Sequence, residues 1–293
     1  MMNKTVGLIG VGIMGKQMVP RLIADGYTVY ANDNSDLAKE FCKEHGVEVL
    51  ATKAELAEKT DKIICSLPNP KVCMIVANEL AKVVNSRHIV METSTMVPDA
   101  AKEIEAVYTE SGASFVEGCI LGRPAGAGEW TIIAGGDAEA VKIMEPVMLP
   151  FSSRVVHSGT VGSANGIKVL NTNMLCIFTS AICETFAMAD AVGVDKEALY
   201  DIVSKSVAAT NCGAFKEVGK RIVDNNFEDP NASLLVGAKD NLCGKDLART
   251  GGISPTFTIS SLMAFENAIS FGLGDLDTAS IYKYFSHVYK NNL

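Results

Sequence analysis

Short apolar runs and longer amphipathic segments alternate along the first half of the chain. The apolar runs are rich in β-branched residues and predict strands at residues 5–9, 28–31, 62–66, 88–92, 114–117, 130–134 and 154–157. Helical periodicity between several of these runs predicts helices at residues 15–25, 37–45, 71–84 and 99–111. This alternation is typical of an α/β fold with a doubly wound, mostly parallel sheet.

The strand pattern stops after residue 162. Helical periodicity then continues at residues 163–192, 196–206, 212–225, 234–250, 260–271 and 279–290. We therefore expect an α/β domain at residues 1–162 and an all-α domain at residues 163–293, joined by the long helix 163–192. That helix is apolar around most of its circumference, so we expect it to be buried between the domains and against a second subunit.

Composition and charge narrow the possible partners. The chain is 48% hydrophobic and 20% charged, as globular proteins are, and its net charge of −8 argues against nucleic acid or an anionic membrane surface. The longest apolar stretch carries Lys168, Asn171 and Glu184 and is too polar to span a bilayer alone. The eight cysteines form no Cys-x-x-Cys pair and the four histidines lie close to no cluster of cysteines, so we expect reduced thiols and no metal site. The N-terminus resembles no signal peptide, and we expect a cytoplasmic protein.

Residues 10–15 read Gly-x-Gly-x-x-Gly, directly after the first predicted strand and directly before the first predicted helix. In that setting the pattern is typical of a dinucleotide-binding turn, although a glycine turn without a ligand is the alternative. The three glycines permit a tight turn, close approach of a pyrophosphate, and close packing of the helix on the strand. The helix N-terminus favours the negative charge of the diphosphate. We expect cofactor contacts from Gly10, Val11, Gly12, Ile13, Met14 and Gly15.

Asp33 ends the second predicted strand, 18 positions after Gly15. An acidic residue at about this distance accepts hydrogen bonds from the adenosine ribose and repels a 2′-phosphate. Neither Asn34 nor Ser35 offers a guanidinium to such a phosphate. We expect a preference for NAD over NADP of at least about tenfold. The alternative is that Asp33 only caps the strand.

Lys168 and Asn171 lie in the first turns of the long predicted helix, shortly after Gly159-Thr160-Val161-Gly162. They are three positions apart, so they share one face of the helix. A lysine among apolar neighbours is costly unless it has a partner or a function. Such a lysine could take the hydroxyl proton when an alcohol loses a hydride. The alternative is a structural lysine that reaches solvent beside a buried asparagine. Periodicity alone favours neither interpretation over the other.

Several motifs, in order along nearly the whole chain, resemble the 3-hydroxyisobutyrate dehydrogenase (β-hydroxyacid dehydrogenase) family. They are residues 7–15, Leu67-Pro68, Glu92-Thr93-Ser94-Thr95 with Pro98, Gly159-x-x-Gly162 with Lys168 and Asn171, and Lys239-Asp240. The resemblance implies a Rossmann domain followed by an all-α domain, a nicotinamide cofactor, and homodimers or homotetramers. It implies that Lys168 is the general acid/base and that Leu67, Pro68, Thr95 and Lys239 contact the cofactor.

Two other residue assignments from the resemblance stay open. Lys245-Asp246 is a second candidate for the Lys-Asp pair, but Lys239 lies at a better distance from Gly252 and Pro255. Glu184 matches a common family position, and a role in pairing helices explains it equally well.

The substrate loop departs from the family pattern Asp-Ala-Pro-Val-Ser-Gly-Gly. Residues 117–124 read Glu-Gly-Cys-Ile-Leu-Gly-Arg-Pro, so Leu121 replaces the serine and Arg123 replaces the second glycine. A guanidinium suits a carboxylate, sulfonate or phosphate. We therefore expect a small anionic hydroxy acid or aldehyde as substrate, bound by Leu121, Gly122, Arg123 and Asn171. The alternative is that Arg123 faces solvent or pairs with Glu117 or Glu129.

Two substrate classes fit this loop. Sulfolactaldehyde reductases of the family carry a Gly-Arg shifted by about one position, which makes a sulfonated three-carbon aldehyde a candidate. A dicarboxylic semialdehyde fits the same chemistry. A further departure is Thr172, where many relatives have a second asparagine, because Asn173 one position later faces differently. Trp130 and His157 lie in predicted strands and are interpreted as structural.

Three other functions are less consistent with the sequence. A 6-phosphogluconate-type oxidative decarboxylase shares the helix lysine, but this chain is short for one and Leu121 removes the serine contact. Imine reductases usually replace the lysine that is present here as Lys168. A cofactor-sensing or interaction module typically loses the lysine or gains basic segments, and this chain does neither.

Overall fold

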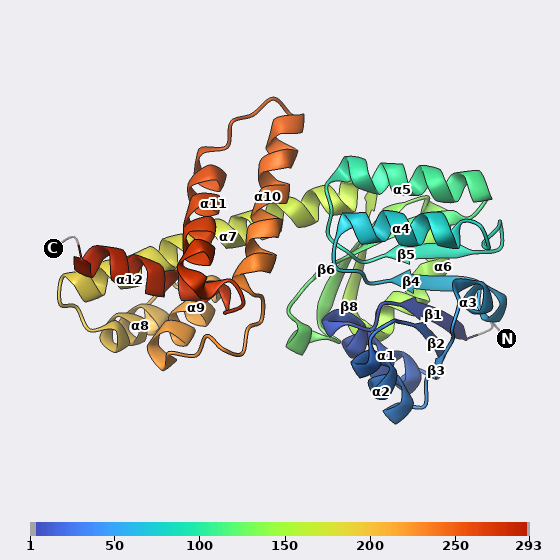
Figure 1. Cartoon of the computed structure of the whole chain (residues 1–293), viewed down its shortest axis with the longest axis horizontal. Coiled ribbons are helices and arrows are strands. Elements are labelled where there is room, and N and C mark those ends of the chain that lie inside the picture. The colour runs from blue at the N-terminus through green and yellow to red at the C-terminus, as the bar shows by residue number, and fades with distance from the viewer. Residues whose placement is uncertain (1–3, 292–293) are drawn as a thin grey trace. The chain divides into compact units, whose positions relative to one another are not determined.

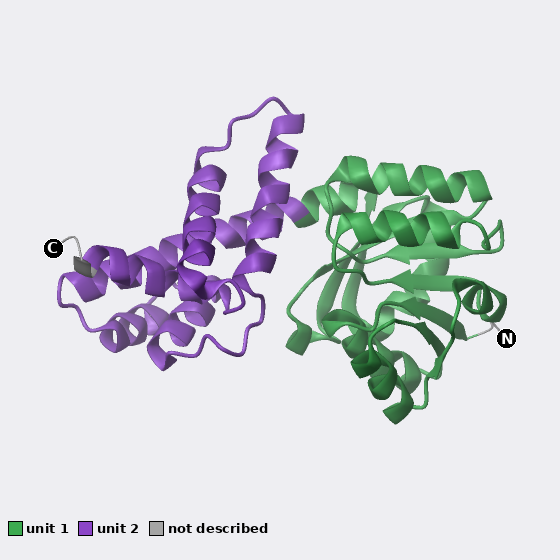
Figure 2. Cartoon of the chain, viewed as in Figure 1, with its two compact units in different colours: residues 1–168 green, residues 169–293 purple. Residues whose placement is uncertain are grey.

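The computed structural model describes residues 4–291, and the chain divides into two compact units, residues 1–168 and 169–293 (Figure 2). The first is an α/β fold and the second is all-helical, as the sequence predicts. The expected domain boundary after residue 162 directly precedes α7 (Ser163–Ala191), whereas the compact units divide inside this helix.

A single eight-stranded sheet runs through the first unit (Figure 1). Its strand order is β3-β2-β1-β4-β5-β6-β7-β8, and every neighbouring pair is parallel except β6 with β7. The first six strands follow the order of dinucleotide-binding doubly wound sheets, so the sheet has the Rossmann topology. The strands are β1 Thr5–Ile9, β2 Thr28–Asn32, β3 Glu48–Val49, β4 Lys62–Cys65, β5 Ile89–Glu92, β6 Ser114–Leu121, β7 Trp130–Gly136 and β8 Ser152–Gly159.

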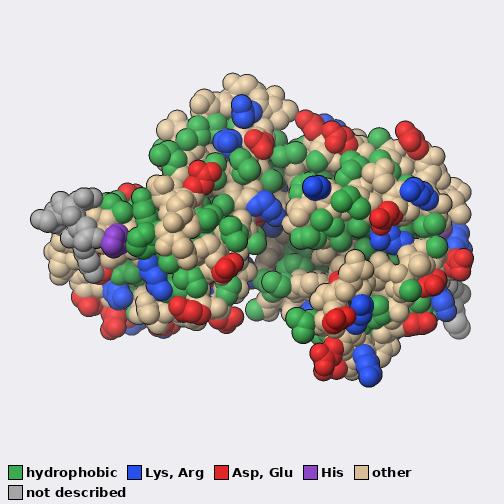
Figure 3. Space-filling model, viewed as in Figure 1, with side chains coloured by type: hydrophobic (Ala, Val, Ile, Leu, Met, Phe, Trp, Pro, Cys, Tyr) green, Lys and Arg blue, Asp and Glu red, His purple; other side chains and the backbone are tan. Residues whose placement is uncertain are grey.

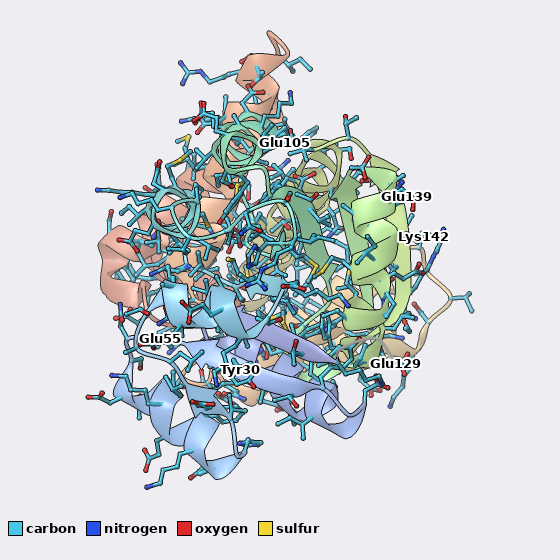
Figure 4. The ribbon with its side chains drawn as sticks, turned by 90° about the vertical axis from the view of Figure 1, so that its right-hand side faces the viewer. Tyr30, Glu55, Glu105, Glu129, Glu139 and Lys142 are labelled. Atoms are coloured by element: carbon cyan, nitrogen blue, oxygen red, sulfur yellow. The ribbon has the colours of Figure 1, made fainter. Side chains whose placement is uncertain are left out.

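Helices cover both faces of this sheet. One apolar cluster, with Met18, Trp130 and Phe151, includes residues of α1, α2 and α6, and the other, with Leu56 and Tyr108, includes residues of α3, α4 and α5. Glu105 on α5 therefore lies on the opposite face from Glu139 and Lys142 on α6 (Figure 4). The helices are α1 Ile13–Ala24, α2 Asp36–Glu44, α3 Lys53–Lys59, α4 Pro70–Leu80, α5 Pro98–Ser111 and α6 Ala138–Met148.

Strand β3 and helices α3 and α6 were not predicted, and strands β6, β7 and β8 extend beyond their predicted bounds. Strand β3 has two residues and α3 seven, too few for periodicity to be detected. The capping box of Thr52 and Glu55 is the local signal that could have identified α3. Pro146 interrupts the pattern of α6. Strand β6 continues past residue 117 to Leu121, because its second half pairs with β7.

The second unit packs its helices around an aromatic core. Phe186, Phe215, Phe227 and Phe265 are buried in it. The helices are α8 Lys196–Lys205, α9 Gly213–Asp224, α10 Leu234–Thr250, α11 Thr256–Ala268 and α12 Ile281–Asn291, together with most of α7. Helix α11 begins four residues before the predicted 260, directly after Pro255, which stands at its N-cap position.

Within the single chain the long helix α7 is buried on one side, and its burial against a second subunit stays a prediction. Val169, Cys176 and Phe186 are buried, whereas Leu170, Met174, Phe178 and Met188 are exposed. Among the described residues, it alone is long and apolar enough to cross a membrane, with 39% of its most apolar window buried. A core helix of a water-soluble protein meets the same criterion, so this is weak evidence for a membrane span.

Candidate active site

The glycine loop lies at the carboxyl end of β1, and each of its glycines has a different environment. Gly10 has a φ of +91°, and a Cβ there would lie 2.2 Å from the Ser66 carbonyl oxygen. A Cβ on Gly15 would lie 2.5 Å from the Gly10 carbonyl oxygen, so this glycine lets α1 pack on the turn. A Cβ on Gly12 would meet nothing within 4 Å. The loop is therefore closed towards the protein at Gly10 and Gly15 and open at Gly12, where a ligand backbone could approach.

The N-terminus of α1 suits an anion. Gly12 provides no side-chain cap, and the first turn of the helix holds no acidic residue. Its amides and dipole favour a negative group at this end. The residues of this loop therefore fit the diphosphate of a dinucleotide, whose nicotinamide ring would accept or supply the hydride.

Asp33 connects the end of β2 to the glycine loop. Its Oδ2 accepts a hydrogen bond from the Val11 N–H at 2.7 Å, and its Oδ1 accepts one from the Ser35 N–H at 2.7 Å. An open groove of about 780 Å³ lies beside it. Lys39 and Lys43 of α2 also line this groove. The sequence did not reveal them as candidates, because they do not lie directly after Asp33.

The loops after β4 and β5 are hydrogen-bonded to each other. The Leu67 N–H donates to Ser94 Oγ at 2.7 Å, and Thr93 Oγ1 donates to the Cys65 carbonyl at 2.9 Å. Pro68 is exposed and Thr95 half-buried. Strand β4 pairs with β1 and β5 pairs with β4, all parallel, so both loops lie at the same edge of the sheet as the glycine loop.

A buried carboxyl group organises these loops, and the sequence motif that contains it gave it no role of its own. Glu92 ends β5, is buried, and accepts a hydrogen bond from the Ser94 N–H at 2.9 Å. Desolvation raises its pKa to about 7, and its hydrogen bonds with Ser94 and Cys73 offset only part of this effect. Burial also raises the pKa of the Cys73 thiol, with a further contribution from the Glu92 charge.

Lys168 lies near the carboxyl end of β6. It is half-buried, and its Nζ donates a hydrogen bond to the Ile120 carbonyl at 2.8 Å. Leu121, Gly122 and Arg123 follow Ile120 directly. The structure therefore brings the proposed proton-transfer group beside the proposed substrate loop.

Trp130 contacts the backbone of this loop at two residues. Its ring is buried, and Nε1 donates to the Arg123 carbonyl at 2.7 Å. A Cβ on Gly122 would lie 2.2 Å from Trp130 Cδ1, so only glycine fits there. Trp130 therefore shapes the backbone of the loop that carries Arg123. His157 has its Nε2 at hydrogen-bond distance from the Gly136 and Gly159 carbonyls.

The remaining candidate residues lie in the second unit. Asn171 is exposed on α7, and Lys239 of α10 pairs with Asp240 at 3.1 Å. Asn173 donates to Thr258 Oγ1 at 3.0 Å, and Thr172 is buried. Glu184 accepts a hydrogen bond from the Tyr289 hydroxyl of α12 at 2.7 Å, an observation that favours its helix-pairing role.

The thiols and the acidic groups show no sign of metal chemistry in the described part of the chain. All eight cysteines are thiols rather than halves of disulfides, and six of them are buried. Within residues 4–291, no three side chains of the His, Cys, Asp or Glu type form a group that could hold a metal ion.

Both units match known protein families. Residues 5–159 match the NAD binding domain of 6-phosphogluconate dehydrogenase, and residues 162–285 match the family described as NAD-binding of NADP-dependent 3-hydroxyisobutyrate dehydrogenase. A probable 3-hydroxyisobutyrate dehydrogenase of Mycobacterium bovis is 25% identical, over 86% of this chain and 88% of that protein. The 2-(hydroxymethyl)glutarate dehydrogenase of Eubacterium barkeri is also 25% identical, over 95% and 93%. The crystal structure of a Salmonella typhimurium 3-hydroxyisobutyrate dehydrogenase has the same fold, with a TM-score of 0.86, 23% identity, and coverage of 96% and 99%.

Proposed function

The chain belongs to the 3-hydroxyisobutyrate dehydrogenase family of nicotinamide-dependent β-hydroxyacid dehydrogenases, and on this premise we propose that Lys168 is its general acid/base. The carrying observation is the bond from Lys168 Nζ to the Ile120 carbonyl, one residue before the loop 121–123. In oxidation, the neutral amine of Lys168 would take the hydroxyl proton, and bound NAD would supply the acceptor for the hydride of the carbon that carries the hydroxyl group. In reduction, the ammonium returns that proton to the oxygen.

We propose that the substrate is small and carries an anionic group that Arg123 binds. Trp130 and Gly122 fix the backbone conformation of the loop from which the Arg123 side chain extends. Leu121 would add an apolar contact to the substrate. Asn171 would add an amide contact. The name of the Eubacterium barkeri relative describes a dicarboxylic acid, which supports a dicarboxylic semialdehyde as one candidate. A sulfonated aldehyde such as sulfolactaldehyde is the other, because Arg123 suits a sulfonate equally.

For the cofactor we propose NAD over NADP, with contacts from residues 10–15, Asp33, Leu67, Pro68, Thr95 and Lys239. The Asp33 carboxylate stands at the end of β2, where a 2′-phosphate would meet its charge. Lys39 and Lys43 line the groove beside it, and Lys39 pairs with Asp36 at 3.2 Å. We keep the expected preference of at least about tenfold.

Three further assignments complete the proposal. Residues 1–162 bind the cofactor and residues 163–293 form the helical domain, which the matched ranges 5–159 and 162–285 support. The acidic composition and reduced thiols support a cytoplasmic location. The exposed apolar face of α7 supports a homodimer or homotetramer.

The first test is a panel of substrates assayed by nicotinamide absorbance, the hydroxy acids with NAD and NADP and the aldehydes with NADH and NADPH. The panel holds 3-hydroxyisobutyrate, 2-(hydroxymethyl)glutarate, sulfolactaldehyde, succinic semialdehyde, tartronate semialdehyde and methylmalonate semialdehyde. We expect turnover of at least one anionic compound and a loss of at least about 100-fold in kcat in Lys168→Ala. Full activity of Lys168→Ala would refute the acid/base role, and equal efficiency with NADP would refute the cofactor preference.

A further inference from the structure

Glu117 is a wholly buried carboxylate in the middle of β6, with 0% of its surface exposed. Its Oε2 accepts hydrogen bonds from the N–H groups of Gly162 at 2.8 Å and Ala164 at 3.3 Å. Its Oε1 accepts two from Asn165, one from the backbone at 3.3 Å and one from the side chain at 2.7 Å. These backbone amides stand at the start of α7, where a helix cannot satisfy its own N–H groups. Glu117 therefore caps α7 from a neighbouring strand, where the helix dipole favours its charge.

Two glycines leave room for this arrangement. Gly135 pairs with Glu117 in the register of β6 with β7, and a Cβ there would lie 2.2 Å from Glu117 Oε2. Gly162 has a φ of +97°, and a Cβ on it would lie 3.0 Å from Lys102 Cε and 3.2 Å from Pro98 Cβ. Gly135 thus leaves the space that the carboxylate fills, and Gly162 adopts the left-handed φ that leads into the helix.

Asn165 links the same carboxylate to a proposed cofactor loop. Its side chain is 1% exposed, and while its Nδ2 donates to Glu117, its Oδ1 accepts from the Met96 N–H at 2.9 Å. Met96 directly follows Thr95, a proposed cofactor contact. One buried amide thus joins the loop after β5 to the first turn of α7.

Lys168 lies one helical turn beyond Asn165. Its Nζ donates to Ile120, which stands three residues after Glu117 on the same strand. Strand β6 therefore holds α7 at two points, the cap at Glu117 and the bond at Ile120. A shift of the helix start would move Nζ away from this place, and a misplacement of about 1 Å can lower a rate by about 100-fold.

We infer that Glu117 and Asn165 are positioning residues, which hold Lys168 in register with the cofactor loop after β5. They speed proton transfer through the lysine and touch neither substrate nor cofactor. The inference rests on the proposed acid/base role of Lys168.

The test compares Glu117→Gln and Asn165→Ala with a matched control, Asp137→Asn. Asp137 is also a capping carboxylate on this sheet, because its Oδ1 accepts from the Glu139 and Ala140 N–H groups, but it caps α6. For each variant we would measure the Kd of NADH by fluorescence, the KM, the kcat per NADH-binding site, and the solvent deuterium isotope effect on kcat. The substrate is the best compound of the panel above.

We expect kcat per binding site to fall about 10- to 100-fold in Glu117→Gln and Asn165→Ala, with KM and the Kd of NADH within about twofold of wild type. The solvent isotope effect should rise, because proton transfer becomes slower than the other steps. Asp137→Asn should change none of these values. A structural role alone would lower the fraction of sites that bind NADH and leave kcat per site unchanged.

Asn165→Ala keeps the Glu117 carboxylate and its backbone bonds, so it tests the inference even where Glu117→Gln does not fold. Wild-type kcat and isotope effect in a folded variant of either kind would overturn the inference. A Lys168→Ala enzyme that turns over normally would instead overturn the proposed function beneath it.

Discussion

At the residue scale, Arg123 is the residue proposed to select the substrate. Its half-buried side chain extends from a backbone held by Trp130. We expect Arg123→Ala to raise the KM for the best anionic substrate at least about tenfold, because a charge-assisted hydrogen bond contributes about 1.5–3 kcal/mol. The kcat should change little, since the proton-transfer lysine stays in place. Steady-state kinetics would measure both.

The matched control is Arg154→Ala, which removes an exposed arginine from β8 in the same unit. It should leave the KM unchanged. If Arg123→Ala and Arg154→Ala have the same KM as wild type, Arg123 does not bind the substrate.

At the element scale, Glu92 joins the ends of β4 and β5 through Ser94 and Leu67. Burial raises its pKa from 4.5 to about 7, so folding favours the protonated form. Its contribution to stability is complete below pH 4.5 and is lost as the pH rises through 7, on the order of 3 kcal/mol for this group. In Glu92→Gln, which stays neutral, the free energy of unfolding should fall less between pH 5 and 8. Urea denaturation at several pH values would measure it.

Glu110→Gln is the control for this pH dependence, because it removes an exposed carboxyl group from the neighbouring α5. Its unfolding should follow the wild-type dependence on pH. A wild-type dependence in Glu92→Gln as well would show that another group titrates.

At the scale of the whole molecule, the second unit exposes a row of apolar side chains on α7. Leu170, Met174 and Phe178 follow one another at helical spacing on α7. Apolar cavities of about 420 and 500 Å³ lie on either side of this helix, against α8 and α9 and against α11 and α12. Figure 3 shows hydrophobic side chains at several places on the surface of this unit. A second copy that covers this surface would give a homodimer.

We expect Phe178→Glu to produce monomers, because the buried charge would oppose association. Light scattering after size-exclusion chromatography would measure the mass. Ile75→Glu on α4 is the matched control, since Ile75 is 49% exposed and Phe178 43%. Wild-type mass in Phe178→Glu, or a monomeric wild type, would contradict the proposed interface.

The features that the sequence predicted correctly are local ones. The strand, glycine turn and helix over residues 5–24 depend on contacts within a few residues, as do the spacing of Lys168 and Asn171 and the helical character of the second half. The family motifs predicted how these elements combine into a Rossmann domain followed by an all-α domain. The comparisons confirm the family and the fold. The roles of the individual site residues stay predictions.

Only the tertiary structure decided which polar groups are buried and what they bind. Glu117 and Gly162, whose N–H group it binds, are 45 positions apart in the sequence. Nothing near Glu117 in the sequence shows that β6 continues beyond it, or that Gly135 leaves space for its side chain. The same is true of Glu92, and of Trp130 beneath Gly122. A buried carboxylate is stable only where distant amides solvate it, so its role depends on the packing of strands and helices rather than on its neighbours in the chain.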